Sequence, residues 1–163
     1  MNPNYKKYLN TAIKKQAENK KFLEKLKRQR IKGLDQVINR LHDEAFQEID
    51  CLQCANCCKT TGPLLLNKDI DRLAKALKTK PSLFAEQYLK IDEDQDIIFK
   101  SMPCVFLEDD HHCNVYEHRP NACREYPHTQ QRDQLQKLKI TFNNSLICPA
   151  VAKIVEALKK KIE

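Results

Sequence analysis

Glycine is almost absent from this chain of 163 residues, and its scarcity constrains the fold more than any other single feature. Only Gly33 and Gly62 occur. Tight turns between strands favour residues that tolerate positive φ, above all glycine, so an all-β sandwich is disfavoured. The length suffices for one compact domain with an appended helical arm. The sequence therefore predicts an α+β protein that is mainly helical.

The first fifty residues have the pattern of a long helical arm. Over residues 34–49, apolar side chains recur at three- and four-residue spacing, which indicates one buried helix face. A looser version of this rhythm occupies residues 9–26. Gly33 separates the two stretches, because glycine costs about 1 kcal/mol in a helix interior. We expect residues 1–50 to form an arm that protrudes or packs, ahead of a domain over residues 51–163.

Short elements are expected in the rest of the chain. Four helices are predicted, starting near Asn67, Pro81, Pro120 and Pro149. Three short apolar runs, at 97–99, 105–107 and 115–116, predict a small antiparallel hairpin or sheet. The acidic stretch 92–96 is expected to be an exposed loop, since it lacks the glycine and the terminal glutamate of a calcium loop.

Positive charge is concentrated at the N-terminus. Lysine and arginine residues outnumber aspartate and glutamate residues by seven, and eleven of the lysines and arginines fall in residues 1–32. Such a surface can attract nucleic acid or anionic membrane, and it could dock a protein. A solvated helix face explains the same charge, and no recognised nucleic-acid motif accompanies it. Nucleic acid is therefore a weakly supported partner, beside an unknown protein or small molecule.

The compartment decides how the cysteines are interpreted. No segment approaches the roughly 18–20 apolar residues that span a bilayer. The N-terminus has lysines but lacks the apolar segment of a secretory signal. We therefore expect a cytoplasmic protein with no membrane span. Thiols stay mostly reduced in that compartment, so clustered cysteines indicate metal binding rather than a disulfide scaffold.

Eight cysteines are candidate metal ligands: Cys51, Cys54, Cys57, Cys58, Cys104, Cys113, Cys123 and Cys148. The Cys51-x-x-Cys54 spacing lets two sulfurs reach one zinc ion at about 2.3 Å. With Cys57 it forms a run that also suits an iron–sulfur cluster. Eight thiolates could make two four-cysteine zinc sites, or one four-cysteine cluster with additional thiols. Some of the last four could instead be ordinary buried cysteines.

Two arginines near Cys123 are candidate binding residues. Arg119 and Arg124 could offset thiolate charge and lower thiol pKa values, or they could bind a carboxylate or phosphate of a cofactor or substrate. The consecutive His111 and His112 lie in an acidic loop, and we expect them to be exposed rather than ligands. No catalytic residue can be assigned.

The cysteines recur within short motifs in a fixed order: Cys51-x-x-Cys54-x-x-Cys57-Cys58, Pro103-Cys104-Val105-Phe106-Leu107, Cys113-Asn114-Val115-Tyr116, Arg119-Pro120-x-x-Cys123-Arg124-x-Tyr126-Pro127 and Cys148-Pro149. Over residues 51–158 this series resembles the CxxCxxCC cysteine-cluster family, a proposed zinc- or iron-chelating domain of the YkgJ type. The resemblance implies metal binding through these cysteines. One departure is Ala55, where the family commonly has glycine.

Three functions remain open from the sequence. The leading one is a metal-binding protein whose thiolates hold zinc or iron, with the metal organising the fold. The second is an iron–sulfur redox or group-transfer enzyme, although no Rossmann glycine pattern, P-loop or catalytic triad occurs. The third is a basic docking module for nucleic acid or protein.

Overall fold

The computed structural model describes residues 1–162 and divides the chain into two compact units. One, the helical unit, comprises Met1–Cys54 together with the chain from Pro127 onward. The other, the hairpin unit, comprises Ala55–Tyr126. The expected division into domains 1–50 and 51–163 stays a prediction. The expected fold class is confirmed, since helices dominate and one two-stranded antiparallel sheet is present.

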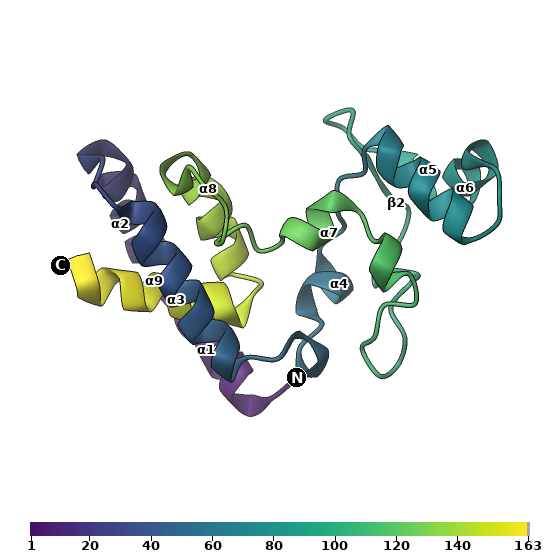
Figure 1. Cartoon of the computed structure of the whole chain (residues 1–163). Helices are drawn as coiled ribbons and strands as arrows, with labels where there is room; N and C mark the ends of the chain where they lie inside the picture. Colours follow the sequence, from purple (N-terminus) through teal and green to yellow (C-terminus); the bar gives the residue numbers. More distant parts are fainter. Residues whose placement is uncertain (163) are drawn as a thin grey trace. The chain divides into compact units, whose positions relative to one another are not determined.

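The helical unit is assembled from both ends of the chain. Its helices are α1 (Pro3–Lys14), α2 (Gln16–Gln29), α3 (Leu34–Glu48), α8 (Gln134–Ser145) and α9 (Pro149–Ile162), with a short 3₁₀ helix, η1 (Cys51–Gln53). Helix α9 packs against α1, α3 and α8, while α2 packs against α8 (Figure 1). The N-terminal helices therefore enclose a shared core with the C-terminal helices.

The buried faces of α3 and α9 are the ones that the apolar spacing predicts. In α3 the buried side chains are Leu34, Ile38, Leu41 and Ala45. In α9 they include Val151, Ile154, Val155 and Leu158. The chain bends before α3 at Gly33, whose φ of 76° is left-handed. Helix α8 has no counterpart among the elements expected from the sequence.

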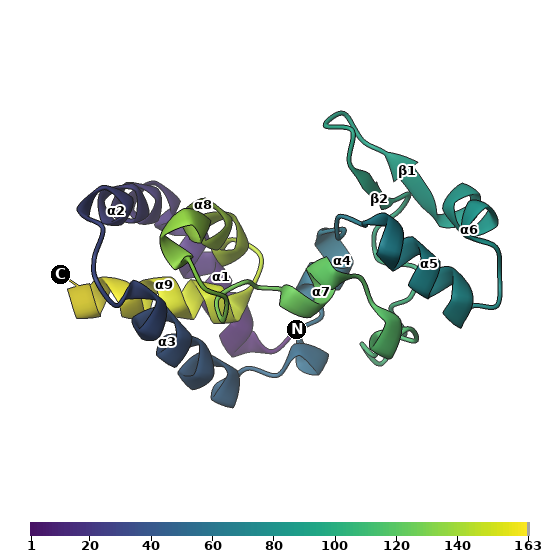
Figure 2. The same ribbon diagram turned by 45° about the horizontal axis from the view of Figure 1, so that its top comes forward.

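The hairpin unit carries short elements around a second core. They are α4 (Asn56–Thr60), α5 (Asn67–Ala76), α6 (Pro81–Tyr88), β1 (Leu89–Ile91), β2 (Ile97–Phe99), η2 (Tyr116–His118) and α7 (Asn121–Glu125). Strand β1 follows α6 directly and pairs with β2, as Figure 2 shows. Helices α5 and α6 confirm the predicted starts near Asn67 and Pro81.

The predicted partners of the strand at 97–99 are wrong. It pairs with Leu89–Ile91, and the acidic stretch between them is the hairpin turn. The Asp92 carboxylate stabilises this turn by accepting hydrogen bonds from the Asp94 and Asp96 amides, both at 2.9 Å. The run at 105–107 contributes only an isolated bridge to residue 113, and the run at 115–116 leads into η2.

Aromatic side chains fill the core of the hairpin unit. The ring centroids of Phe84 and Phe106 are 6.3 Å apart, and Phe99 meets Phe106 edge-on at 5.7 Å. Cys104 and Cys113 pack against this core. The unit thus places two candidate ligands on the surface of its own core. Throughout residues 1–162, no helix is both long and apolar enough to cross a membrane.

Candidate metal centre

The eight cysteines form two groups according to the unit that carries them. The hairpin unit holds Cys57, Cys58, Cys104, Cys113 and Cys123, and the helical unit holds Cys51, Cys54 and Cys148. No disulfide joins any of these eight described residues. All candidate ligands are therefore present as thiols.

Backbone hydrogen bonds connect three of the cysteine-bearing segments of the hairpin unit. The Cys104 amide donates to the Cys58 carbonyl at 2.8 Å, which joins the loop after β2 to α4. The Leu107 amide donates to the Cys104 carbonyl at 3.0 Å and closes a turn. Leu107 in turn pairs with Cys113 across an isolated antiparallel bridge. Segments far apart in the sequence are thereby held together around the thiols.

The thiols of these segments interact electrostatically with one another. Burial, reinforced by the charges of Cys58, Cys104 and Cys113, raises the pKa of Cys123 to about 12. Burial also raises the pKa of Cys104, and Cys58 and Cys113 act in the same direction. Like charges interact in this way only when they are close. These shifts agree with the backbone contacts that join the segments of Cys58, Cys104 and Cys113. We call Cys58, Cys104, Cys113 and Cys123 the hairpin thiols.

Cys58 differs from the other hairpin thiols because its ionised form is stabilised. A hydrogen bond from Cys57, with the two sulfurs 3.9 Å apart, lowers the Cys58 pKa to about 7, against the opposing effect of burial. The charge of Lys59 lowers it further. Lys59 Nζ also lies 2.7 Å from His111 Nε2. Near neutral pH, a substantial share of Cys58 is therefore ionised to the thiolate.

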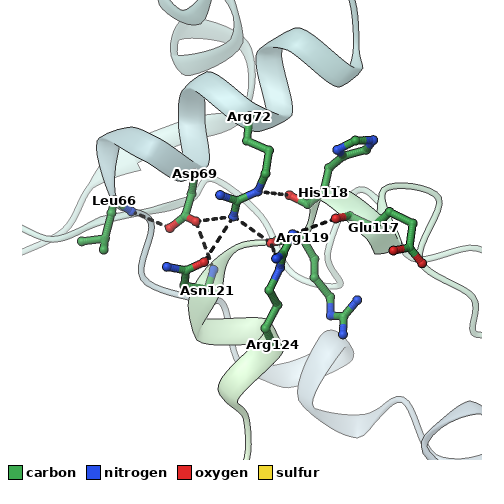
Figure 3. A network of polar contacts seen from close by, with 8 residues as sticks. All are labelled: Leu66, Asp69, Arg72, Glu117, His118, Arg119, Asn121 and Arg124. Atoms are coloured by element: carbon green, nitrogen blue, oxygen red, sulfur yellow. Dashed lines mark hydrogen bonds and ion pairs between the residues drawn. The ribbon is translucent and has the colours of Figure 1, made fainter.

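A buried carboxylate anchors the segment that leads to Cys123. Asp69, at the start of α5, has a side chain only 1% exposed. It accepts hydrogen bonds from the Leu66 amide at 3.0 Å and from the Asn121 amide at 3.1 Å, and it pairs with Arg72 (Figure 3). Although burial acts to raise its pKa, these donors together hold the pKa of Asp69 below its usual range. The first residue of α7 is thereby fixed to α5.

Arg72 extends this anchor to the chain before α7. Its guanidinium donates to the His118 carbonyl at 3.2 Å and to the Arg119 carbonyl at 3.0 Å. Neither Asp69 nor Arg72 is among the candidate site residues that the sequence indicates. The i,i+3 spacing of Asp69 and Arg72 is a local signal for their ion pair. No local pattern could have found the contact with Asn121, which lies 52 residues beyond Asp69.

The two arginines chosen from the sequence bind backbone carbonyls. Arg124 donates to the Glu117 carbonyl at 2.7 Å and to the Arg119 carbonyl at 3.2 Å. Arg119 donates to the Tyr116 carbonyl at 2.6 Å, and its guanidinium carbon lies 3.7 Å from the centroid of the Tyr116 ring. The positive charge of Arg119 also lowers the pKa values of nearby thiols, against the larger effect of burial. Its position suits the charge-offsetting role; a role in binding a cofactor stays a prediction.

In the helical unit, Cys54 and Cys148 approach the same core. Cys54 is 7% exposed within that core, and Cys148 packs against it. Cys51 begins η1, and the Cys54 amide closes the turn by donating to the Cys51 carbonyl at 3.0 Å. Burial raises the pKa of Cys148 to about 12; the Val151 and Ala150 amides oppose this shift, and Cys51 and Cys54 reinforce it. We call these three residues the helical-unit thiols.

Ala55, between Cys54 and Cys57, has a backbone conformation that explains a feature of the resemblance noted above. Its φ of 49° and ψ of 19° are left-handed, and only glycine adopts this region without steric cost. A glycine at this position would satisfy the same turn more easily. This chain therefore keeps the left-handed conformation at residue 55 although the residue is alanine.

The chemistry of the donor set fits zinc or iron, because thiolates are preferred ligands of both. Within residues 1–162, however, no three histidine, cysteine or acidic side chains already have the arrangement of a metal site. Metal binding would have to draw the thiols of one neighbourhood together. The assignment of individual ligands therefore stays a prediction.

Comparison with known proteins gives one match. Residues 50–148, more than half of the chain, match the model of the CxxCxxCC family, which is described as a putative zinc- or iron-chelating domain. No curated protein and no solved structure matches the chain. The matched region begins one residue before Cys51 and ends at Cys148, so it includes every candidate thiol. The chain belongs to the CxxCxxCC family.

Proposed function

We propose that this protein binds zinc or iron through the hairpin thiols Cys58, Cys104, Cys113 and Cys123. The observation that carries the proposal is the backbone contact between their segments: the Cys104 amide donates to the Cys58 carbonyl at 2.8 Å, and Leu107 bridges to Cys113. Four thiolates are a complete ligand set for a structural zinc ion. The same set suits a four-cysteine iron–sulfur cluster, which would add redox or group-transfer chemistry.

The build of the hairpin unit supports a structural contribution from the metal. The cysteine-bearing segments are a five-residue helix, a turn, a short loop and another five-residue helix. Such segments bury little apolar surface of their own. Thiolate–metal bonds at a structural zinc site can contribute about 10 kcal/mol or more of folding free energy. A bound ion would hold these segments in place.

The raised pKa values of the buried thiols agree with metal binding. In the absence of metal, Cys123 stays protonated because burial penalises its thiolate. A divalent cation reverses that preference, since metal ligands must be deprotonated. Thiols that bind metal must also be reduced, so the proposal implies a reducing compartment such as the cytoplasm.

The test is a zinc titration of the metal-free full chain under anaerobic conditions, compared with a double variant, Cys104→Ser with Cys123→Ser. We expect the variant to lose one bound ion. The matched control is His112→Ala, which removes a potential ligand from an exposed site beside Asp110. It should bind as the wild type does. Unchanged zinc binding by the double variant would refute the proposed site.

A further inference from the structure

We propose that the outward face of α2 binds double-stranded nucleic acid through its phosphate backbone. This face carries five cations, Lys20, Lys21, Lys25, Lys27 and Arg28, and we call it the cationic face. The inference goes beyond the proposed function, because α2 belongs to the helical unit and lies outside the residues that match the family. Failure of either proposal therefore leaves the other intact.

The positive charge of the chain is concentrated in one of its two units. The helical unit contains nineteen lysine and arginine residues against ten aspartate and glutamate residues. The hairpin unit, in contrast, contains ten against twelve. The net charges of the two units are thus +9 and −2, which together give the +7 of the whole chain. A polyanion is therefore attracted to the helical unit.

Within the helical unit, α2 presents its cations to solvent. Its buried side chains are Asn19, Phe22, Leu23 and Leu26. The helix packs against α8 and α1 (Figure 2), whereas all five residues of the cationic face are exposed. Because residues three and four apart share a side of a helix, Lys21, Lys25 and Arg28 form one row.

The charge of the cationic face is not neutralised within the described part of the chain. Among residues 1–162, none of its five cations forms an ion pair. Helix α2 contains two acids, and Glu18 is paired with Lys159 of α9, whose Nζ lies 2.6 Å from the carboxylate. Glu24 is therefore the one acid of α2 left to oppose the five cations.

The spacing of the row is comparable to the charge spacing of a nucleic-acid strand. With a rise of about 1.5 Å per residue, Lys21 and Arg28 lie about 10 Å apart along the helix axis. One strand of a DNA duplex carries a phosphate about every 3.4 Å along its axis, which gives about three phosphates in that distance. The three cations of the row can therefore face about three phosphates.

Helix α2 lacks the features that other anionic partners require. A helix that lies on a membrane inserts large apolar side chains, and a protein interface has an apolar centre. In α2, which the structure describes throughout, no large apolar side chain is exposed. Binding of single strands relies on aromatic side chains that stack on the bases, whereas the one aromatic residue of α2, Phe22, is buried. The cationic face therefore fits the repeating phosphates of a duplex, whatever its sequence.

The test is fluorescence anisotropy of a labelled DNA duplex of mixed sequence, titrated with the full chain at several salt concentrations. The variant replaces the row, Lys21→Gln with Lys25→Gln and Arg28→Gln. Each lost phosphate contact reduces the slope of log affinity against log salt concentration by about 0.9. We therefore expect the slope to become shallower by about 2.7, and the affinity at about 0.15 M salt to fall by about 100-fold.

The matched control removes the same charge from the hairpin unit, by Lys68→Gln with Lys75→Gln and Lys80→Gln. These three lysines are exposed. Exposed substitutions of this kind change stability little, so both variants should fold, which circular dichroism verifies. The control should bind the duplex almost as tightly as the wild type, with its salt slope unchanged.

Equal losses of affinity in the two variants would overturn the proposal, because net charge rather than the cationic face would then attract the duplex. A wild-type chain without salt-dependent binding would also overturn it. So would a chain that binds vesicles containing phosphatidylserine but not the duplex. The salt slope of the wild type needs no variant, so the proposal stays testable if a variant fails to fold.

Discussion

Replacement of Asp69 by asparagine tests whether the buried anchor holds the hairpin unit together. The substitution keeps the size of the side chain and removes its charge. Asp69 accepts from two backbone amides and from the Arg72 guanidinium. Asparagine offers a single acceptor oxygen, and its amino group would face one of these donors. At least one buried donor would therefore lose its acceptor.

The magnitude follows from the burial and charge of the anchor. A hydrogen bond to a charged group contributes about 1.5–3 kcal/mol, and breaking a buried ion pair costs about 3–5 kcal/mol. The Asp69 side chain is 1% exposed, whereas that of Arg72 is 26% exposed and reaches solvent. The lower end of the range applies, so Asp69→Asn should destabilise the unit by about 3 kcal/mol.

The assay is hydrogen exchange of the metal-free chain followed by peptide mass spectrometry, because it assigns stability to each unit separately. Peptides of α5 and α7 should lose protection in Asp69→Asn, while those of α3 and α9 should not. The matched control is Asp71→Asn, an exposed acid on the same helix, which should change stability by less than about 0.5 kcal/mol.

The pH dependence gives a second check on the same residue. Because its folded pKa is lowered, Asp69 contributes stability above the unfolded carboxyl value of about 3.9, and the contribution is lost as pH falls through the folded pKa. The difference between wild type and Asp69→Asn should thus shrink in acid. Equal protection of α5 and α7 in both proteins at pH 7 would refute the reasoning.

Three further predictions concern other parts of the chain. Ala55→Val should destabilise the protein by about 2 kcal/mol in urea unfolding, since a β-branched residue is strained at positive φ. Ala55→Gly should be neutral or stabilising. Equal changes in unfolding free energy for the two variants would contradict the left-handed turn. The metal-free protein should lose stability as the pH rises from about 8.5, the pKa of a thiol in the unfolded chain, towards 12, because the folded pKa of Cys148 is raised. The test compares the urea midpoints of unfolding at pH 7 and pH 10. Equal midpoints would refute the prediction. Lys159→Ala should cost about 3 kcal/mol, because Lys159 is 5% exposed and its ammonium contacts Glu156 and the buried Asn19. Exposed Lys160→Ala should change the unfolding midpoint little and serves as the control.

Elements with a clear apolar face could be predicted from the sequence, and those without one could not. The spacing of apolar residues located α3 and α9, and proline marked the start of α6 and α9. Helix α8 was missed because most of its buried residues are polar. They are Gln134, Leu138, Thr141, Asn144 and Ser145. Gln134 and Asn144 donate to backbone carbonyls of the preceding loop, and no periodic pattern predicts such contacts.

Strand pairing was also beyond the reach of local patterns. Leu89 continues the apolar spacing of α6, so the pattern alone would extend that helix, but Leu89 begins β1 opposite Phe99. Both side chains are buried in the hairpin-unit core. Packing against that core, rather than propensity, decides where the helix ends. The acidic turn between the strands was recognised as a loop but not as a hairpin.

The candidate ligands could be found from the sequence, whereas their grouping could not. Spacing identifies cysteines that can chelate, such as Cys51 with Cys54. It cannot reveal that Cys58 lies with Cys104, because a long-range backbone hydrogen bond makes that contact. Nor can it reveal that Cys148 packs beside Cys54, which depends on how α9 enters the core. Tertiary contacts therefore determine which thiols can share an ion.

The measurement that tests the central claim most directly is the metal and acid-labile sulfide content of the full chain after anaerobic purification. We expect at least one thiolate-bound zinc or iron per chain. Iron with matching sulfide would identify a cluster, and zinc without sulfide would identify mononuclear sites. A folded chain with eight reduced thiols, no metal, and no uptake of added zinc or iron would contradict the account.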